Sequence, residues 1–219
     1  MPFNDVAKNA ALDALDDTGA VPITFVGVHQ ASADPGTGTN STGTEATGGA
    51  PAYARQAVVF GAAAAGLKSN TGALTFDVPA GTYAYFILMN HLTTNTNNYR
   101  GFIPFGGAAA IKGFFSSDVI ANDALRSGAH GLVNTDRVIL YNVFAESLPT
   151  GTGLTEGALL FVVGATTDTF QASLTSGGAA IDITATGEGY FQKVVPEVFA
   201  SQGQITVAAG ALVLDATAM

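Results

Sequence analysis

Short apolar runs separated by turn-forming residues fill the stretch 130–192, and they constrain this chain more strongly than any other feature. The runs 138–141 and 159–163 are β-branched, aromatic or continuously apolar. Residues 169–174 and 181–184 alternate apolar and polar side chains, which is the two-residue period of a strand with one buried face. None of these runs has the length or the period of a helix, so the sequence predicts a compact antiparallel β module here.

Turn chemistry between these runs predicts how they connect. Gly164–Asp168 and Ser176–Gly178 contain residues that tolerate positive φ or bond their own backbone. We therefore expect two hairpins, 159–174 and 169–184.

The first half of the chain has a similar but less regular pattern. Residues 3–15 are the best helix candidate, with Asn4 placed to cap the helix and Gly19 placed to end it. The apolar runs predict strands at 23–29, 52–61, 74–78, 82–92 and, less clearly, 114–120. The polar, Gly/Thr/Ser-rich tract 30–51 has no periodicity, and a loop of this length in a compact domain is usually functional or mobile.

The end of the chain predicts the domain organisation. Residues 204–215 resemble a hairpin, in which Ile205 and Val207 would face the same side as Leu212 and Leu214. An isolated hairpin is only marginally stable, so it must pair with another sheet, and the break at Pro196 favours the first half of the chain. We predict an all-β fold: an antiparallel β-sandwich-like host domain with a short N-terminal helix, and an inserted small antiparallel β module. The expected boundaries are 1–116 plus 194–219 for the host and 117–193 for the module.

Charge, cysteine content and hydrophobicity exclude several classes of function. Only 11% of the residues are charged and the net charge is −9, so a phosphate-binding surface for nucleic acid is not expected. The chain has no cysteine, which excludes disulfides and thiolate metal sites. No apolar stretch is long enough to span a membrane, and no leader pattern suggests a signal peptide. A surface with so little charge suits a protein that works packed against others.

Residue types that carry chemistry are present but scattered. His29, His91 and His130 share no ligand spacing, and we expect His29 and His91 to be solvated or hydrogen-bonded residues at strand ends. Asp13, Asp16 and Asp17 could hold a cation, although a solvated helix end explains them better. Glu146, Glu156 and Glu188 form no specific carboxylate pair, and no nucleophile elbow is present. We therefore expect no enzyme, no cofactor and no metal.

Two stretches carry a resemblance to a known class of proteins. The first runs from Glu45 to Arg55, EATGGAPAYAR, followed by QAVVF and TFDVPAGT. It resembles small β proteins encoded among the structural genes of tailed bacteriophages, especially siphophages of actinobacteria. The second is AHGLVNTDRVILYN followed by LTEGALLFVVGATTDTFQASLTSGGAAIDIT. It resembles a small β module that recurs in phage structural proteins. Together the likeness covers about residues 1–92 and 118–216.

The resemblance implies a virion structural protein of minor tail or head-decoration type, assembled in the host cytoplasm. Its expected partners are major capsid or tail proteins and further copies of this chain. A second hypothesis is a receptor- or glycan-binding tail-tip or fibre module that contacts a host-surface glycan. A hydrolase is the third and least supported class. The surface-contact residues that we predict are Thr44, Tyr53, Tyr99 and Arg100.

Overall fold

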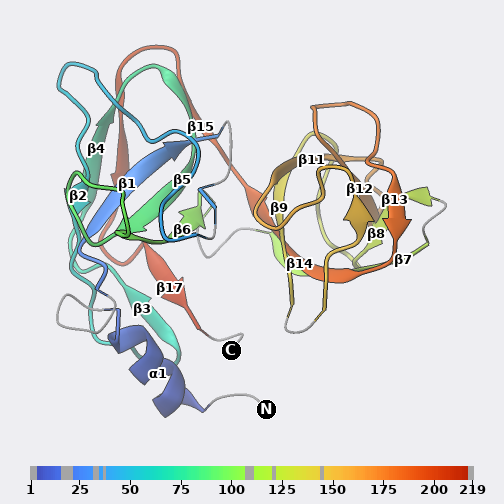
Figure 1. Cartoon of the computed structure of the whole chain (residues 1–219), viewed down its shortest axis with the longest axis horizontal. Helices are drawn as coiled ribbons and strands as arrows, with labels where there is room; N and C mark the ends of the chain where they lie inside the picture. Colours follow the sequence, from blue (N-terminus) through green and yellow to red (C-terminus); the bar gives the residue numbers. More distant parts are fainter. Residues whose placement is uncertain are drawn as a thin grey trace. The chain divides into compact units, whose positions relative to one another are not determined.

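The structure is a computed structural model that describes residues 4–15, 22–31, 35–36, 38–106, 111–119, 122–143 and 146–216. It confirms the predicted all-β fold with one short N-terminal helix (Figure 1). In chain order the elements are α1 (Asp5–Asp13), β1 (Phe25–Gln30), β2 (Gln56–Ala57), β3 (Leu67–Ser69), β4 (Leu74–Val78), β5 (Gly81–Met89), β6 (Tyr99–Pro104), β7 (Lys112–Val119), β8 (Ala124–Arg126), β9 (Arg137–Tyr141), β10 (Thr150–Gly151), β11 (Leu159–Val163), β12 (Thr169–Ser173), β13 (Ile183–Ala185), β14 (Glu188–Val194), β15 (Glu197–Phe199), β16 (Gly203–Val207) and β17 (Val213–Asp215).

The chain divides into two compact units. The first comprises Met1–Ala108 and Pro196–Met219, and the second comprises Ala109–Val195. The boundaries expected from the sequence were 117 and 193, so the two divisions differ mainly over residues 109–116. Strand β7 accounts for this difference, because it begins at Lys112 and pairs with β14 and β8 inside the second unit.

The first unit is built around a sheet in which β5 is the central strand. β1 pairs along one edge of β5, β6 and β15 pair along the other, and β2 extends the sheet beyond β1. The antiparallel pairs β16–β4 and β17–β3 supply further apolar side chains. Val26 and Val28 from the sheet share one buried cluster with Phe76 and Ile205 from these pairs, which gives the core of a sandwich.

Strand β5 is buried on both faces, which explains its continuous apolar run. Leu88 belongs to the main core, whereas its neighbours Ile87 and Met89 form a second buried cluster with Tyr99. A strand covered on one face only would alternate apolar and polar residues. The second face is therefore shielded from solvent as well.

The C-terminal segment packs where the sequence predicted, but its pairing differs from the prediction. The four apolar side chains expected to cover the host are all buried in its core: Ile205, Val207, Leu212 and Leu214. The predicted hairpin is wrong, because β16 pairs with β4 and β17 pairs with β3. The buried Asn70 side chain lies between the two arms: it accepts a bond from Leu212 N (2.8 Å) and donates one to Ala208 O (3.0 Å).

The second unit is a closed barrel with the strand order β11–β12–β8–β7–β14–β9. The predicted hairpin 159–174 is confirmed by the pairing of β11 with β12. The predicted hairpin 169–184 is wrong, because β8 occupies the other edge of β12 and β13 pairs with β10 instead. Barrel closure explains this, since every strand edge in a closed barrel must find a neighbour.

Three smaller expectations also need correction. The strand predicted at 52–61 shortens to β2, because Tyr53 and Arg55 direct their side chains into polar contacts described below. The sequence predicted no strand between 92 and 114, yet residues 99–104 form β6 and β7 begins at Lys112. His29 lies at the end of β1 as expected, but it is only 1% exposed, so of the two expected alternatives the solvated one is wrong.

Helix α1 begins as predicted, with the Asn4 side chain accepting a hydrogen bond from Ala7 N (2.9 Å). At its other end Asp13 accepts from the buried Lys68 Nζ (2.7 Å) and from Ala63 N (3.0 Å). Asp16 and Asp17, the other members of the possible cation cluster, lie outside the described residues. Asp13 therefore ties α1 to β3.

We expect the Asp13 contact to make the first unit sensitive to acid. Lys68, and then the Ala63 amide, hold the pKa of the Asp13 carboxyl below its ordinary value of 3.8. A lowered pKa stabilises the fold above the unfolded value and loses that contribution as the pH falls through the folded value. Asp13→Asn should therefore be less stable than the parent at pH 7, and the difference should shrink below about pH 4. Chemical unfolding at several pH values measures the difference, and Glu197→Gln, which removes an exposed carboxylate, is the control. A difference that does not shrink as the pH falls below about 4 would contradict the assignment.

Leu212 gives a test of the core of the first unit. It is only 2% exposed and packs in the main cluster, so Leu212→Ala should cost about 2–5 kcal/mol of unfolding free energy. Denaturant unfolding measures this loss, and Val198→Ala is the control because Val198 is largely exposed. Equal effects of the two substitutions would show that Leu212 does not pack as described.

Candidate functional site

Residues 44–46 lie antiparallel beside β1 and bring a charged side chain over the sheet. Gln30 N donates to Thr44 O (2.8 Å) and Ala46 N donates to Val28 O (2.9 Å), so Glu45 stands opposite His29. A Cβ at Gly27 would lie 2.7 Å from Glu45 Oε1 and 2.8 Å from the Tyr53 hydroxyl. Gly27 therefore leaves the room that these two side chains need above the sheet.

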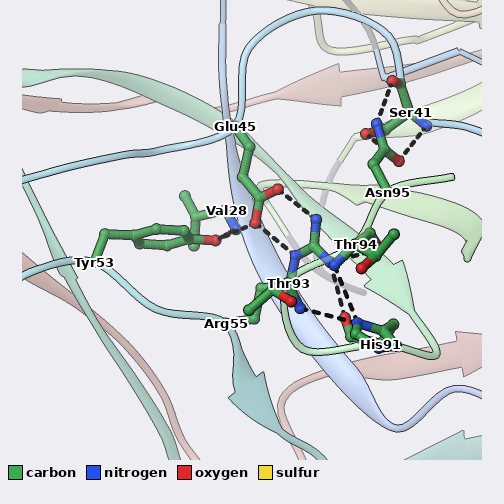
Figure 2. A network of polar contacts seen from close by, with 9 residues as sticks. All are labelled: Val28, Ser41, Glu45, Tyr53, Arg55, His91, Thr93, Thr94 and Asn95. Carbon is green, nitrogen blue, oxygen red and sulfur yellow. Dashed lines mark hydrogen bonds and ion pairs between the residues drawn. The ribbon is translucent and has the colours of Figure 1, made fainter.

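Glu45 and Arg55 form a bidentate ion pair in this space (Figure 2). Arg55 Nε donates to Oε1 (2.8 Å) and Nη2 donates to Oε2 (2.7 Å). The pair is largely shielded from solvent, with side-chain exposures of 4% for Arg55 and 20% for Glu45. Because two parallel bonds fix the relative orientation of both groups, this pair holds the long loop in one geometry.

Arg55 also reaches a second loop, which connects β5 to β6. Its Nη1 donates to the carbonyls of His91 (2.8 Å) and Thr94 (3.2 Å). His91 in turn accepts hydrogen bonds at Nδ1 from the amides of Thr93 and Thr94, which shapes the turn (Figure 2). One guanidinium thus joins the loop after β5 to the loop before β2.

Tyr53 completes the network from the other side of Glu45. Its hydroxyl donates to Glu45 Oε1 (2.9 Å) and accepts from Val28 N (2.8 Å). Burial, and then the charge of Glu45, raise the pKa of the Tyr53 phenol far above its ordinary value. The phenol is therefore a neutral donor at neutral pH.

A second set of contacts joins the same two loops farther along. Asn95 Oδ1 accepts from Ser41 N (2.9 Å), and Asn95 Nδ2 donates to Ser41 O (2.9 Å). Asn97 N donates to the side chain of Asn40 (2.6 Å). Much of the polar tract that the sequence left without structure is therefore fixed by side-chain bonds.

The four predicted surface-contact residues lie around these two loops, but they differ in exposure. Thr44 is exposed, Tyr53 is half-buried in the network, and Arg100 is half-buried with Nη1 donating to the carbonyls of Asn97 and Tyr99. Tyr99 is only 4% exposed, and its hydroxyl donates to Gly36 O (2.8 Å). The Tyr99 ring is thus part of the second buried cluster and is not presented to solvent.

Sequence reasoning missed Glu45, Arg55 and Asn95 as a group. One signal was present: Glu45 and Arg55 are the only Asp, Glu, Lys or Arg residues between positions 35 and 67. Two opposite charges in an otherwise uncharged tract favour pairing, because an unpaired buried charge is costly. The contribution of Asn95 depends on the meeting of two loops 54 residues apart, which no local pattern encodes.

The network is suited to holding loops. Both Glu45 oxygens are occupied by donors from Tyr53 and Arg55. Across the part of the chain that the structure describes, no group of three or more His, Cys, Asp or Glu residues is arranged to hold a metal ion. In the same described residues no helix combines the length and apolar character needed to cross a membrane. His130, the remaining histidine, is buried against Phe170 in the barrel core.

The chain leaves the first sheet and returns to it along the same edge of β5. At the end of β6, Pro104 pairs with Tyr85 of β5, and at the start of β15, Glu197 pairs with Tyr83. Both strands run antiparallel to β5, so β15 continues along the edge where β6 stops. The second unit is therefore inserted between two collinear halves of one edge strand.

The ion pair gives a test of this loop arrangement. Arg55→Ala leaves the Glu45 carboxylate without its bidentate partner, so unfolding free energy should fall by about 3–5 kcal/mol. The double variant Glu45→Met/Arg55→Met should be less damaged, because it leaves no unpaired buried charge. Denaturant unfolding compares the two, and a double variant as unstable as Arg55→Ala would show that charge burial is not the dominant cost.

Comparison with known proteins identifies one family. The family model described as podophage GP4 fiber I protein gp80 matches residues 2–112. This is just over half of the 219 residues, and it includes α1, the two joined loops and the strands up to β6. Searches of curated proteins and of solved structures found no significant match. The chain belongs to the family of the podophage GP4 fiber I protein gp80, and it is a virion-associated phage structural protein of fibre type.

Proposed function

We propose that this chain is a fibre component in which the first unit attaches to the virion and the inserted barrel contacts the host surface. The family match supports the first part, because it is confined to residues 2–112 and ends where the barrel begins with β7. The observation that carries the proposal is the insertion of the barrel into one edge strand of the first sheet.

This insertion suits a displayed module for a physical reason. The pairing of β5 with β1 on its inner edge is untouched, and the two halves of the edge strand both remain paired. The barrel has its own buried cluster, which includes Leu125, Leu160 and Phe170. A unit with its own core can carry a recognition surface without disturbing the sheet that holds it.

Further copies of this chain and other virion proteins are the proposed partners of the first unit. Val6, Val59 and Val198 expose most of their side chains, and only 11% of the residues of the chain are charged. Repeated copies would strengthen individually weak contacts through avidity. In this proposal the chain acts by binding alone, without catalysis or a cofactor, and assembles in the host cytoplasm before it is carried on the virion.

The test is competition for adsorption. Purified full-length chain should reduce adsorption of the phage that encodes it, by occupying sites on the host cell. A variant in which a short Gly/Ser linker replaces residues 109–195 should not compete, although circular dichroism should show that its sheet remains folded. Phage that carry the same deletion should assemble fibres and adsorb poorly. A deletion variant that competes as well as the full chain would overturn the assignment of host contact to the barrel.

A minor tail or decoration protein is the second candidate, as the sequence resemblance implies. The low charge of the chain and the exposed valines of the first unit favour it, because both suit packing in a lattice. Gold labelling of an epitope tag in the barrel distinguishes the two: labels along fibres support the fibre component, and labels on the capsid or the tail tube support the second candidate.

A further inference from the structure

A pocket of about 570 Å³ lies in the second unit, beside the short pair β10–β13. Its walls come from three segments: residues 150–152, residues 173–175 at the end of β12, and residues 179–182 with Thr184. This volume lies within the range of about 300–1,000 Å³ that is usual for small-molecule sites. All of its lining residues are described, and none belongs to the loop network of the first unit.

The lining combines hydroxyl groups with a small apolar surface. Five of the eleven lining residues are Thr or Ser: Thr150, Thr152, Ser173, Thr175 and Thr184. Leu174 and Ile181 supply the apolar part. Asp182 is the one charged side chain in the lining, and no Lys, Arg or His is among the residues that form it.

Glycines set the shape of this pocket. A Cβ at Gly151 would lie 2.8 Å from Asp182 O and 2.9 Å from Ile181 Cγ2, so the wall at this point has no room for a larger residue. A Cβ at Gly153 would lie 2.6 Å from the Leu174 side chain, which packs across it. Leu174 is nevertheless 55% exposed, which leaves an apolar side chain at the pocket.

We propose that this pocket binds a neutral sugar residue of a host-surface glycan, a proposal that rests on the proposed function of the barrel. A sugar ring has hydroxyl groups at its rim and an apolar C–H face. Side-chain hydroxyls and the Asp182 carboxylate can bond the ring hydroxyls, and a carboxylate can accept two of them at once. The exposed Leu174 side chain offers apolar surface to the C–H face.

The charge of the lining selects against acidic sugars. A phosphate or carboxylate ligand would meet the Asp182 carboxylate with no cation in the lining to balance it. A flat aromatic ligand is also a poor match, because hydrogen-bonding groups are so frequent in the lining. An uncharged, hydroxyl-rich ring is not repelled by Asp182, and it can use the hydrogen-bonding groups of the lining.

Heteronuclear NMR of the full-length chain tests this site directly. The probes are the methyl glycosides of glucose, galactose, mannose and N-acetylglucosamine, with glucuronate and glucose 6-phosphate as charged comparisons. We expect at least one neutral glycoside to shift the amide signals of Gly151, Thr152 and Asp182 in a saturable way, and the charged sugars to bind more weakly. If no neutral glycoside shifts these signals, or if a charged sugar binds best, the proposal is overturned.

Two pairs of variants locate binding in the pocket. Ala179→Phe fills the space and should abolish the shifts, whereas Val133→Phe, at a position that is 60% exposed elsewhere in the barrel, should leave them unchanged. Asp182→Asn should weaken binding about tenfold, because a charged acceptor is lost, and the exposed Glu188→Gln should not. Thermal unfolding confirms that each variant is folded. Equal binding by Ala179→Phe and the parent would overturn the proposal.

The adsorption assay separates this inference from the proposed function. If the full-length chain competes with the phage and Ala179→Phe competes equally well, the barrel contacts the host through another surface and the pocket inference fails alone. If the chain without residues 109–195 still competes, the proposed function fails as well.

Discussion

The pairing of β5 on both of its edges is the constraint on which the first unit depends. On one edge the strand binds β1 through residues 83–89, and on the other it binds β6 and then β15. This arrangement pairs β5 along both of its edges (Figure 1). Its apolar side chains belong to buried clusters on both faces of the sheet. Because the outer edge is shared between two short strands, the chain can leave the sheet and return to it almost at the same point.

Because β5 is buried on both faces, its second face needs a cover, and the polar loops contribute to that cover. The face with Ile87 and Met89 requires a cover, and residues 36–55 contribute to it through the Tyr99 contact at Gly36 and through Glu45 above Gly27. A loop rich in Gly and Thr has few apolar side chains of its own to hold it there. The ion pair of Glu45 with Arg55 and the amide contacts of Asn95 hold the loop there instead of apolar contacts. A buried ion pair contributes more to a single geometry than to net stability, because desolvation offsets much of its attraction.

Several elements could be predicted because their causes are local. The Asn4 cap, the β11–β12 hairpin and the core positions of Leu212 and Leu214 follow from a capping side chain, a turn and a two-residue period. The candidate site was predicted less well. Tyr53 and Tyr99 are predicted to present their rings on the surface, yet both use their hydroxyls in contacts within the first unit. The Tyr53 hydroxyl contacts Glu45 and Val28 N of β1, and the Tyr99 hydroxyl donates to Gly36 O. A tyrosine in a polar tract has the same sequence signature whether its ring is exposed or buried.

The sequence by itself determined the strands with a clear apolar pattern, such as β1, β4, β5, β11 and β12, and which of their faces is apolar. It did not reveal the short strands β3, β10 and β15, or the strands β6, β8 and β14. Only the tertiary structure decided which strands are neighbours. Side-chain alternation specifies a face, whereas pairing uses backbone N–H and C=O groups that are identical in every strand. Two hairpins that were plausible by turn chemistry therefore gave way to distant partners: β16 and β17 bind β4 and β3 around Asn70, and β12 binds β8 because the barrel closes. The pocket beside β10 and β13 has the same origin, since it forms where segments separated by turns meet.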